Sequence, residues 1–261
     1  MKLLGHAFKI IRAYGPSAIL LLILFGLWET GSKVDLIPHF IAPPPTEIIE
    51  VLYTKAGSFW NHFYATFLEV LYGYTLGLIV GLILGIAIAY SSLTNRTLYP
   101  LIVVSQTIPI IAMGPVLVLI FGFGPASKVF MVAVVVFFPI TMNTADGLKS
   151  VDPELLRFLR SLGASEWAMF WKIKFPSALP TIFTAIKIAA TYGVIAAVVG
   201  EMVGAQFGLG ALLIRSHRMM MPASLFGSVA LMAVLGISWF LAAVAAERLI
   251  IPWHFARVSR K

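Results

Sequence analysis

The sequence VDPELLRFLRSLGASEWAMFWKIKFP, residues 151–176, is a charged segment set between long apolar runs. The flanking runs, residues 129–144 and 179–204, contain only two charged side chains between them. Apolar runs of that kind favour lipid, whereas residues 151–176 favour water and form amphipathic patterns. The contrast indicates a membrane protein with a segment outside the bilayer that is open to a soluble partner.

Composition places most of the chain in lipid. Its 261 residues are 60% hydrophobic and only 11% charged, with a mean hydropathy of +0.95, which exceeds the range of soluble domains. Only helices or closed barrels cross a bilayer, and apolar runs of about 20 residues favour helices over short alternating strands. The predicted fold class is therefore all-α integral membrane protein, with residues 1–261 forming a single transmembrane domain.

Six apolar runs are long enough to serve as membrane spans. They lie at residues 14–30, 66–90, 102–122, 129–144, 179–204 and 225–250. An even number puts both termini on one side, and thirteen of the 19 Lys and Arg residues fall on that side against five on the other. Both termini and residues 151–176 are therefore predicted to be cytoplasmic. The net charge of +8 follows from this topology and requires no nucleic-acid partner.

Residues 151–176 predict two short helices. Asp152 is a good N-cap before Pro153, and Gly163 suits the left-handed position at a helix end. The first helix has an apolar stripe of Leu155, Leu156, Leu159 and Leu162, and a polar side of Glu154, Arg157, Arg160 and Ser161. Taken alone, the pattern fits two interpretations equally well. It is either a docking unit for another protein or an amphipathic loop that rests on lipid headgroups.

Small residues along the second span indicate a packing seam. Glycines recur at four-residue spacing, which places them on one helical face where another helix can approach closely. They are Gly73, Gly77, Gly81 and Gly85. A gating hinge is the alternative interpretation.

The third span contains two prolines that kink or break it. Broken helices at membrane depth occur where they face protein or a water-filled path. Gln106, Thr107 and Pro109 are therefore candidates for lining a translocation pathway, with packing inside the helix bundle as the alternative.

Two further polar residues are pathway candidates. Asn143 ends the fourth span and either lines an inner gate or satisfies backbone groups. Glu201 lies near the outer end of the fifth span, where pairing with Arg215 or Arg218 is the expected arrangement and substrate contact the alternative. By contrast, Lys187 is expected to snorkel toward the cytoplasm and Glu69 to reach the outer interface, neither with a functional role.

No enzymatic constellation is present in the sequence. It lacks G-x-x-x-x-G-K-[ST], H-E-x-x-H and G-x-S-x-G, and it has no cysteine, so no catalytic or metal site is expected. Energy for transport must then come from another polypeptide. A self-sufficient channel or secondary transporter is the alternative of another class, although the inverted repeats common in such carriers are not visible.

Several motifs resemble one family of transporters. Gly163, nine residues, and then Ile173, Lys174, Phe175 and Pro176 are similar to the G-x9-I-x-L-P half of the EAA signature of permease subunits in binding-protein-dependent ABC importers. The Glu-Ala-Ala half is missing. Further fragments resemble the nitrate, sulfonate, taurine, pyrimidine-precursor and riboflavin branch, in the same order, at residues 42–47, 105–109, 121–124, 127–128, 138–140, 143–144, 199–201 and 208–210.

This resemblance, which covers residues 20–250, implies a mechanism and a set of partners. Two permease subunits, expected as a homodimer, would enclose one pathway in a bacterial cytoplasmic (inner) membrane. Two ABC ATPase subunits would bind ATP and Mg, leaving no cofactor in this chain, and an external or periplasmic solute-binding protein would deliver the cargo. Residues 152–162 would be the coupling helix. The residues expected to meet the ATPase are Glu154, Leu155, Leu156, Arg157, Leu159, Arg160, Leu162 and Gly163. The implied cargo is a pyrimidine thiamine precursor or riboflavin, with sulfonate, taurine or nitrate as the alternative.

Overall fold

The structure, a computed structural model, describes the backbone of residues 2–254 and the side chains of residues 15–254. Every regular element in the described backbone is helical, in agreement with the predicted all-α class. Basic residues near the two termini that entered the topology prediction lie outside the described side chains.

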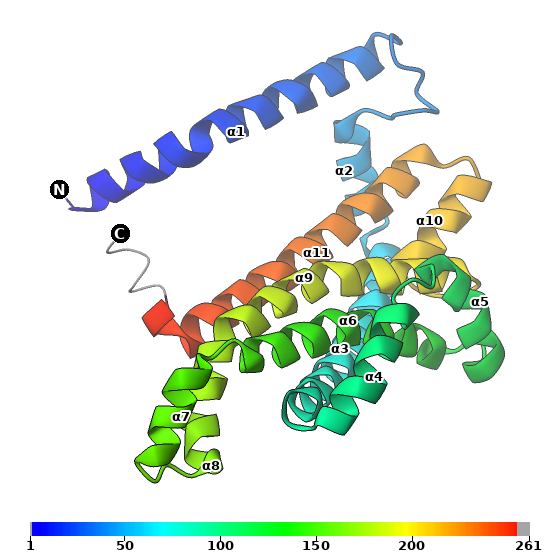
Figure 1. The fold of residues 1–261 in the computed structure, drawn as a ribbon. Coiled ribbons are helices and arrows are strands. Elements are labelled where there is room, and N and C mark those ends of the chain that lie inside the picture. The colour runs from blue at the N-terminus through cyan, green and yellow to red at the C-terminus, as the bar shows by residue number, and fades with distance from the viewer. Residues whose placement is uncertain (1, 255–261) are drawn as a thin grey trace. The chain divides into compact units, whose positions relative to one another are not determined.

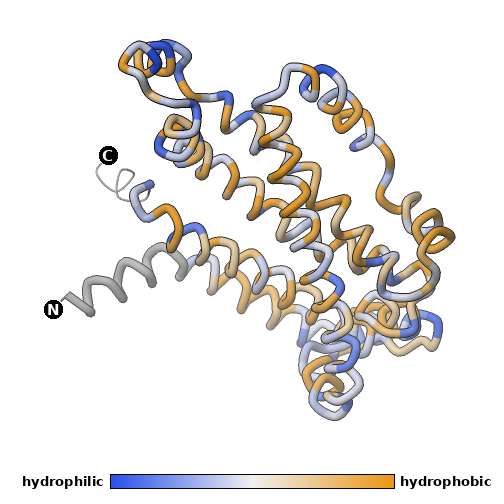
Figure 2. The backbone as a smooth tube through the Cα atoms, turned by 90° about the horizontal axis from the view of Figure 1, so that it is seen from below, coloured by the Kyte–Doolittle hydropathy of each residue, from blue (hydrophilic) through white to orange (hydrophobic). Residues whose placement is uncertain are grey.

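Five helices are long and apolar enough to cross a membrane. They are α1 (Lys2–Lys33), α3 (Ala56–Tyr90), α6 (Pro125–Lys149), α9 (Phe175–Met202) and α11 (Pro222–Ile250). The number rises to six when α4 (Ser92–Ser105) and α5 (Ile110–Phe121) are taken as one broken span. Figure 2 shows hydrophobic residues running along the long helices, with hydrophilic residues gathered at turns and short helices.

Short helices connect these spans. They are α2 (Pro45–Thr54), α7 (Pro153–Ser161), α8 (Glu166–Met169) with a π-helical turn at Phe170–Lys174, and α10 (Leu209–Arg218). Several helices extend beyond the predicted spans, because helical hydrogen bonding continues past the edge of the apolar run. Thus α3 starts ten residues before the predicted residue 66, and α6 reaches Lys149 rather than residue 144.

The predicted third span is divided in two. Residues 106–109 separate α4 from α5, and the two helices are bent by 103°. Pro109 explains the break, since a proline disfavours helical geometry in the residue before it and lacks an N–H. Pro115, the other predicted breaker, lies inside α5 without interrupting it.

The chain divides into two compact units. One contains residues 1–60 and 212–229, and the other contains residues 61–211 and 230–261. In the first unit, the Glu29 carboxylate accepts hydrogen bonds from the N–H (3.1 Å) and hydroxyl (2.7 Å) of Thr46 and pairs with Lys33 at 2.6 Å. These contacts tie the end of α1 to the start of α2. The single transmembrane domain expected from the sequence stays a prediction.

The second unit is centred on α3, α6 and α9. Its core includes Val70, Val132, Val136, Ile140, Ala185, Ala189 and Ala196, all fully buried. Tyr74 of α3 donates a hydrogen bond to the carbonyl of Ile186 in α9 at 2.7 Å. Figure 1 shows α7 and α8 at the end of α6 and α9 that lies away from α5.

The glycine row of α3 lies against α6. A Cβ atom at Gly77 would stand 2.5 Å from the Ala133 carbonyl oxygen, and one at Gly85 would stand 2.8 Å from that of Thr141. Gly73 and Gly81 meet α6 in the same way. Backbone atoms cannot move aside as a flexible side chain can. This face of α3 therefore accepts glycine but not a residue with a Cβ atom.

The Gly77→Ala substitution should therefore destabilise the protein. Overpacking of this kind costs about 1–3 kcal/mol, and we expect a lower melting temperature in detergent solution. Gly236→Ala in α11 is the matched control, because a Cβ there meets nothing within 4 Å. Equal melting temperatures for the two variants would contradict the close contact between α3 and α6.

Candidate functional site

Local sequence determines both ends of α7. The Asp152 carboxylate accepts a hydrogen bond from the N–H of Glu154 at 2.7 Å, which caps the first turn. At the other end Gly163 has φ +84°, and the Ala164 N–H donates to the Leu159 carbonyl at 3.0 Å. The cap and the end of the helix lie at the residues predicted from the sequence.

The apolar side of α7 differs from the predicted leucine stripe. Leu155, Phe158 and Leu162 are exposed by 43%, 60% and 67%, whereas Leu156 and Leu159 are half-buried. Residues three and four apart share a helix face, so Phe158 lies between Leu155 and Leu162. The grouping of leucines overlooked Phe158, and the outward apolar face consists of these three residues.

Charged residues link α7 to α8. Arg160 donates from Nε to the Glu166 carboxylate at 2.7 Å, and Lys174 lies 3.7 Å from the same carboxylate. Arg157 pairs with Glu154 along the exposed side of α7 at 3.7 Å. Exposed pairs contribute little stability. Of these contacts, the Arg160–Glu166 pair is the one that joins α7 to α8.

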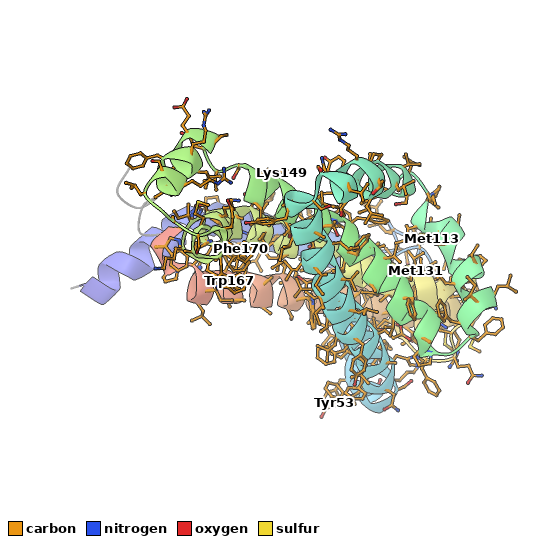
Figure 3. All side chains as sticks on the ribbon, turned by 60° about the horizontal axis from the view of Figure 1, so that its bottom comes forward. Tyr53, Met113, Met131, Lys149, Trp167 and Phe170 are labelled. Carbon is orange, nitrogen blue, oxygen red and sulfur yellow. The ribbon has the colours of Figure 1, made fainter. Side chains whose placement is uncertain are left out.

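An aromatic cluster joins this helical pair to the membrane helices. Phe170 packs edge-on against Tyr90 at the end of α3, with ring centroids 5.7 Å apart, and also contacts Phe175 at the start of α9. Lys174 Nζ lies 4.6 Å from the centre of the Tyr90 ring, within cation–π range. Trp167 lies beside Phe170 (Figure 3) and remains 71% exposed. A displacement of α7 and α8 would therefore act directly on α3 and α9.

The break between α4 and α5 borders a cavity of about 510 Å³. Three pathway candidates from the sequence, Gln106, Thr107 and Pro109, all line it. The remaining lining comes from Ile108, Ile110 and Met113 at the break and on α5, from Val134, Val135, Phe138 and Pro139 of α6, and from Ile188 and Tyr192 of α9. Their role in transport stays a prediction, but the structure brings them together in one space. Tyr192 was missed because nothing near it in the sequence marks a pathway.

Asn143 does not line this cavity. Its side-chain amide donates to the Pro139 carbonyl of its own helix at 2.8 Å. In this conformation it makes the backbone hydrogen bond that was one of its two expected roles.

Glu201 is buried in a hydrogen-bond network. One carboxylate oxygen accepts from the Thr66 hydroxyl and the other from the Gly210 N–H, both at 2.6 Å, and the residue is 1% exposed. Pairing with Arg215 or Arg218 stays a prediction. Its place on the pathway stays a prediction.

The same network holds the connection between α9 and α10. The Leu209 N–H donates to the Thr66 hydroxyl oxygen at 2.8 Å, and His62 Nδ1 lies 3.1 Å from the Gly208 nitrogen. Gly208 has φ +119°, which a residue with a side chain rarely adopts. This irregular backbone is thereby clamped to α3.

Two other ionisable residues lie in settings that the sequence did not reveal. The Lys187 ammonium group pairs with Glu247 of α11 at 2.7 Å, and its snorkelling toward the cytoplasm stays a prediction. Glu69 is only 6% exposed rather than at an interface, and with Lys128 it lines a separate cavity of about 1030 Å³. Lys128 donates to the carbonyls of Phe123 and Gly124. The correction for Glu69 arises because packing between helices, as well as depth along one helix, decides where a charged residue lies.

Removal of the Glu201 carboxylate should destabilise the clamp. Glu201→Ala leaves the buried Gly210 N–H without its acceptor, which costs about 1–3 kcal/mol. The Thr66 hydroxyl keeps the His62 carbonyl as an acceptor at 3.2 Å. Glu201→Gln keeps one acceptor oxygen and should lose less. Melting temperatures in detergent test this order, and an alanine variant as stable as wild type would refute the clamp.

Comparison with known proteins adds the family context. A formylaminopyrimidine transport permease of Halalkalibacterium halodurans is 33% identical, covering 93% of this chain and 97% of its own length. A riboflavin transport system permease of Chloroflexus aurantiacus is 32% identical over 92% and 89%, and a taurine transport system permease of Escherichia coli is 29% identical over 90% and 88%.

A solved structure shares the fold. The chain superposes on an inward-facing methionine ABC transporter with a TM-score of 0.55 and 21% identity, over 75% of this chain and 97% of that one. Residues 73–253 match the family described as binding-protein-dependent transport system inner membrane component. This chain therefore belongs to that family, the permease subunits of ABC importers.

Proposed function

We propose that the outward face of α7, formed by Leu155, Phe158 and Leu162, is the docking site of a separate ABC ATPase that drives import through this permease. The observation that carries the proposal is a capped amphipathic helix, placed in the chain between membrane helices, on which Leu155, Phe158 and Leu162 are exposed. The sequence contains no phosphate-binding loop, so the nucleotide must be bound elsewhere.

The contacts of α7 and α8 suggest how force would reach the membrane. Closure of the ATPases on ATP would displace α7, and the Arg160–Glu166 pair would carry α8 with it. Phe170 would then press on Tyr90 and Phe175, the residues at the ends of α3 and α9. In this mechanism the aromatic cluster transmits the motion and the exposed face of α7 receives it.

The assembly proposed around this chain follows the family. It comprises two permease copies, expected to be identical, two ATPases that bind ATP and Mg, and an external solute-binding protein. The chain would reside in a bacterial inner membrane with both termini in the cytoplasm. This orientation is supported by the excess of Lys and Arg on the side of the termini.

The proposed cargo is a pyrimidine thiamine precursor or riboflavin. Support comes from relatives at 33% and 32% identity that are named for transport of formylaminopyrimidine and riboflavin. Permeases named for taurine, aliphatic sulfonates and nitrate match at 26–30% identity, which makes those anions the alternative cargo.

Charged substitutions on the outward face of α7 should release the ATPase. The double variant Leu155→Asp, Phe158→Asp places two carboxylates where apolar anchors are expected, and loss of one such anchor costs about 2 kcal/mol or more. We expect at least about a tenfold drop in ATPase co-purified with the permease. Leu36→Asp, at a leucine that is 80% exposed in the connection between α1 and α2, is the control. Undiminished co-purification of the double variant would exclude this docking face.

The proposed orientation can be read from single cysteines, since the natural chain has none. Ser161→Cys on α7 should react with a membrane-impermeant maleimide only in inverted vesicles, and Leu36→Cys only in intact spheroplasts. Both positions are exposed. The reverse pattern of labelling would place both termini outside and remove the basis for ATPase docking.

A further inference from the structure

The cavity at the break between α4 and α5 has the size of a small-molecule site. Binding cavities for small molecules typically occupy about 300–1000 Å³ and are mostly apolar with a few polar groups. This one occupies about 510 Å³ and draws its walls from the helix break, α6 and α9. Three elements distant in sequence thus contribute to one open cavity within the second unit.

Two polar side chains in the cavity have unused hydrogen-bonding capacity. Neither the Gln106 amide nor the Tyr192 hydroxyl forms a hydrogen bond with another described residue, although both line the space. Thr107 donates its hydroxyl proton to the Val104 carbonyl at 2.7 Å, which leaves its oxygen able to accept. The cavity therefore presents donors and acceptors together.

The backbone adds further groups. Pro139 lies inside α6 and has no N–H, so the carbonyl of Val135 lacks its usual helical donor, and both residues line the cavity. Pro109 makes no side-chain cap for α5, whose first residue, Ile110, also borders the space. A carbonyl acceptor and uncapped N–H donors suit the ring nitrogens and carbonyls of a heterocycle.

The lining contains no full charge. None of its described residues is acidic, basic or histidine. An anion moved from water into such a space would lose hydration without gaining a paired cation, which is unfavourable. The start of α5 carries only about half a positive charge. Tyr192, whose side chain is 54% exposed, offers an aromatic face suited to stacking on a flat ring.

We propose that Gln106, Tyr192 and the Val135 carbonyl form a cargo subsite that binds an uncharged, flat nitrogen heterocycle and discriminates against sulfonate and nitrate. This inference rests on the proposed import function and deepens it. Gln106 and the Val135 carbonyl form hydrogen bonds with the polar edge of the ring, and Tyr192 stacks on its face.

Protection of a cysteine from labelling tests the subsite without depending on the binding protein. Met113→Cys, on the cavity wall, is placed in the otherwise cysteine-free permease, purified with its ATPase in lipid nanodiscs, and reacted with a water-soluble thiol reagent. Riboflavin or a formylaminopyrimidine should slow the reaction at least about fivefold, and taurine or nitrate at equal concentration should not. Leu36→Cys should react at the same rate with every compound.

Substitution of Tyr192 then assigns the contact. In the Met113→Cys background, Tyr192→Ala should raise the heterocycle concentration needed for half-protection at least about tenfold, because base-like rings lose a stacking partner. Tyr192→Phe, which keeps the ring, should stay within about threefold.

The subsite is overturned if neither heterocycle protects Met113→Cys, if taurine or nitrate protects equally well, or if the cysteine never reacts, since water would then not reach the cavity. An alanine variant at position 192 that behaves like wild type overturns the role of the ring. Each result can be separated from failure of the import function, which would appear as loss of ATPase from a permease with intact α7.

Discussion

The structure depends on the need to satisfy backbone hydrogen bonds where water is absent. In hydrocarbon an unpaired N–H or C=O costs several kcal/mol, so a chain this apolar must cross as helices. The backbone departs from that rule at two informative places. One is the break at residues 106–109, which opens on a cavity, and the other is the connection after α9, which Glu201 and Thr66 bond to α3. At these two places, protein groups or a cavity lie beside the irregular backbone.

Close packing makes the second unit able to carry motion. The glycine row of α3 brings its backbone against α6, and small alanines let α6 pack along α9. Both α6 and α9 border the cavity near the helix break, and both lead to the end where α7 and α8 lie (Figure 1). Densely packed helices transmit displacement rather than absorb it. In the proposed mechanism, a force on α7 would therefore change the walls of the cavity with few intermediate contacts.

Two lysines between the helices are matched by specific partners. Lys187 meets Glu247 between α9 and α11, and Lys128 donates to two carbonyls just before the start of its own helix. These groups lie outside the residues that line the cavity at the helix break. The arrangement separates charges that position helices from the uncharged groups proposed to meet cargo.

The sequence by itself determined the fold class, the approximate spans, the cap at Asp152, the end of α7 at Gly163 and the break near Pro109. All of these depend on periodicity or on residues a few positions apart, so they can be read along the chain. Only the tertiary structure decided that Glu201 bonds Thr66 across 135 positions, that Lys187 meets Glu247 across 60, and that Tyr192 shares a cavity with Gln106. The physical reason is that a buried polar group takes whichever partner helix packing brings within about 3 Å, and no local pattern encodes that partner.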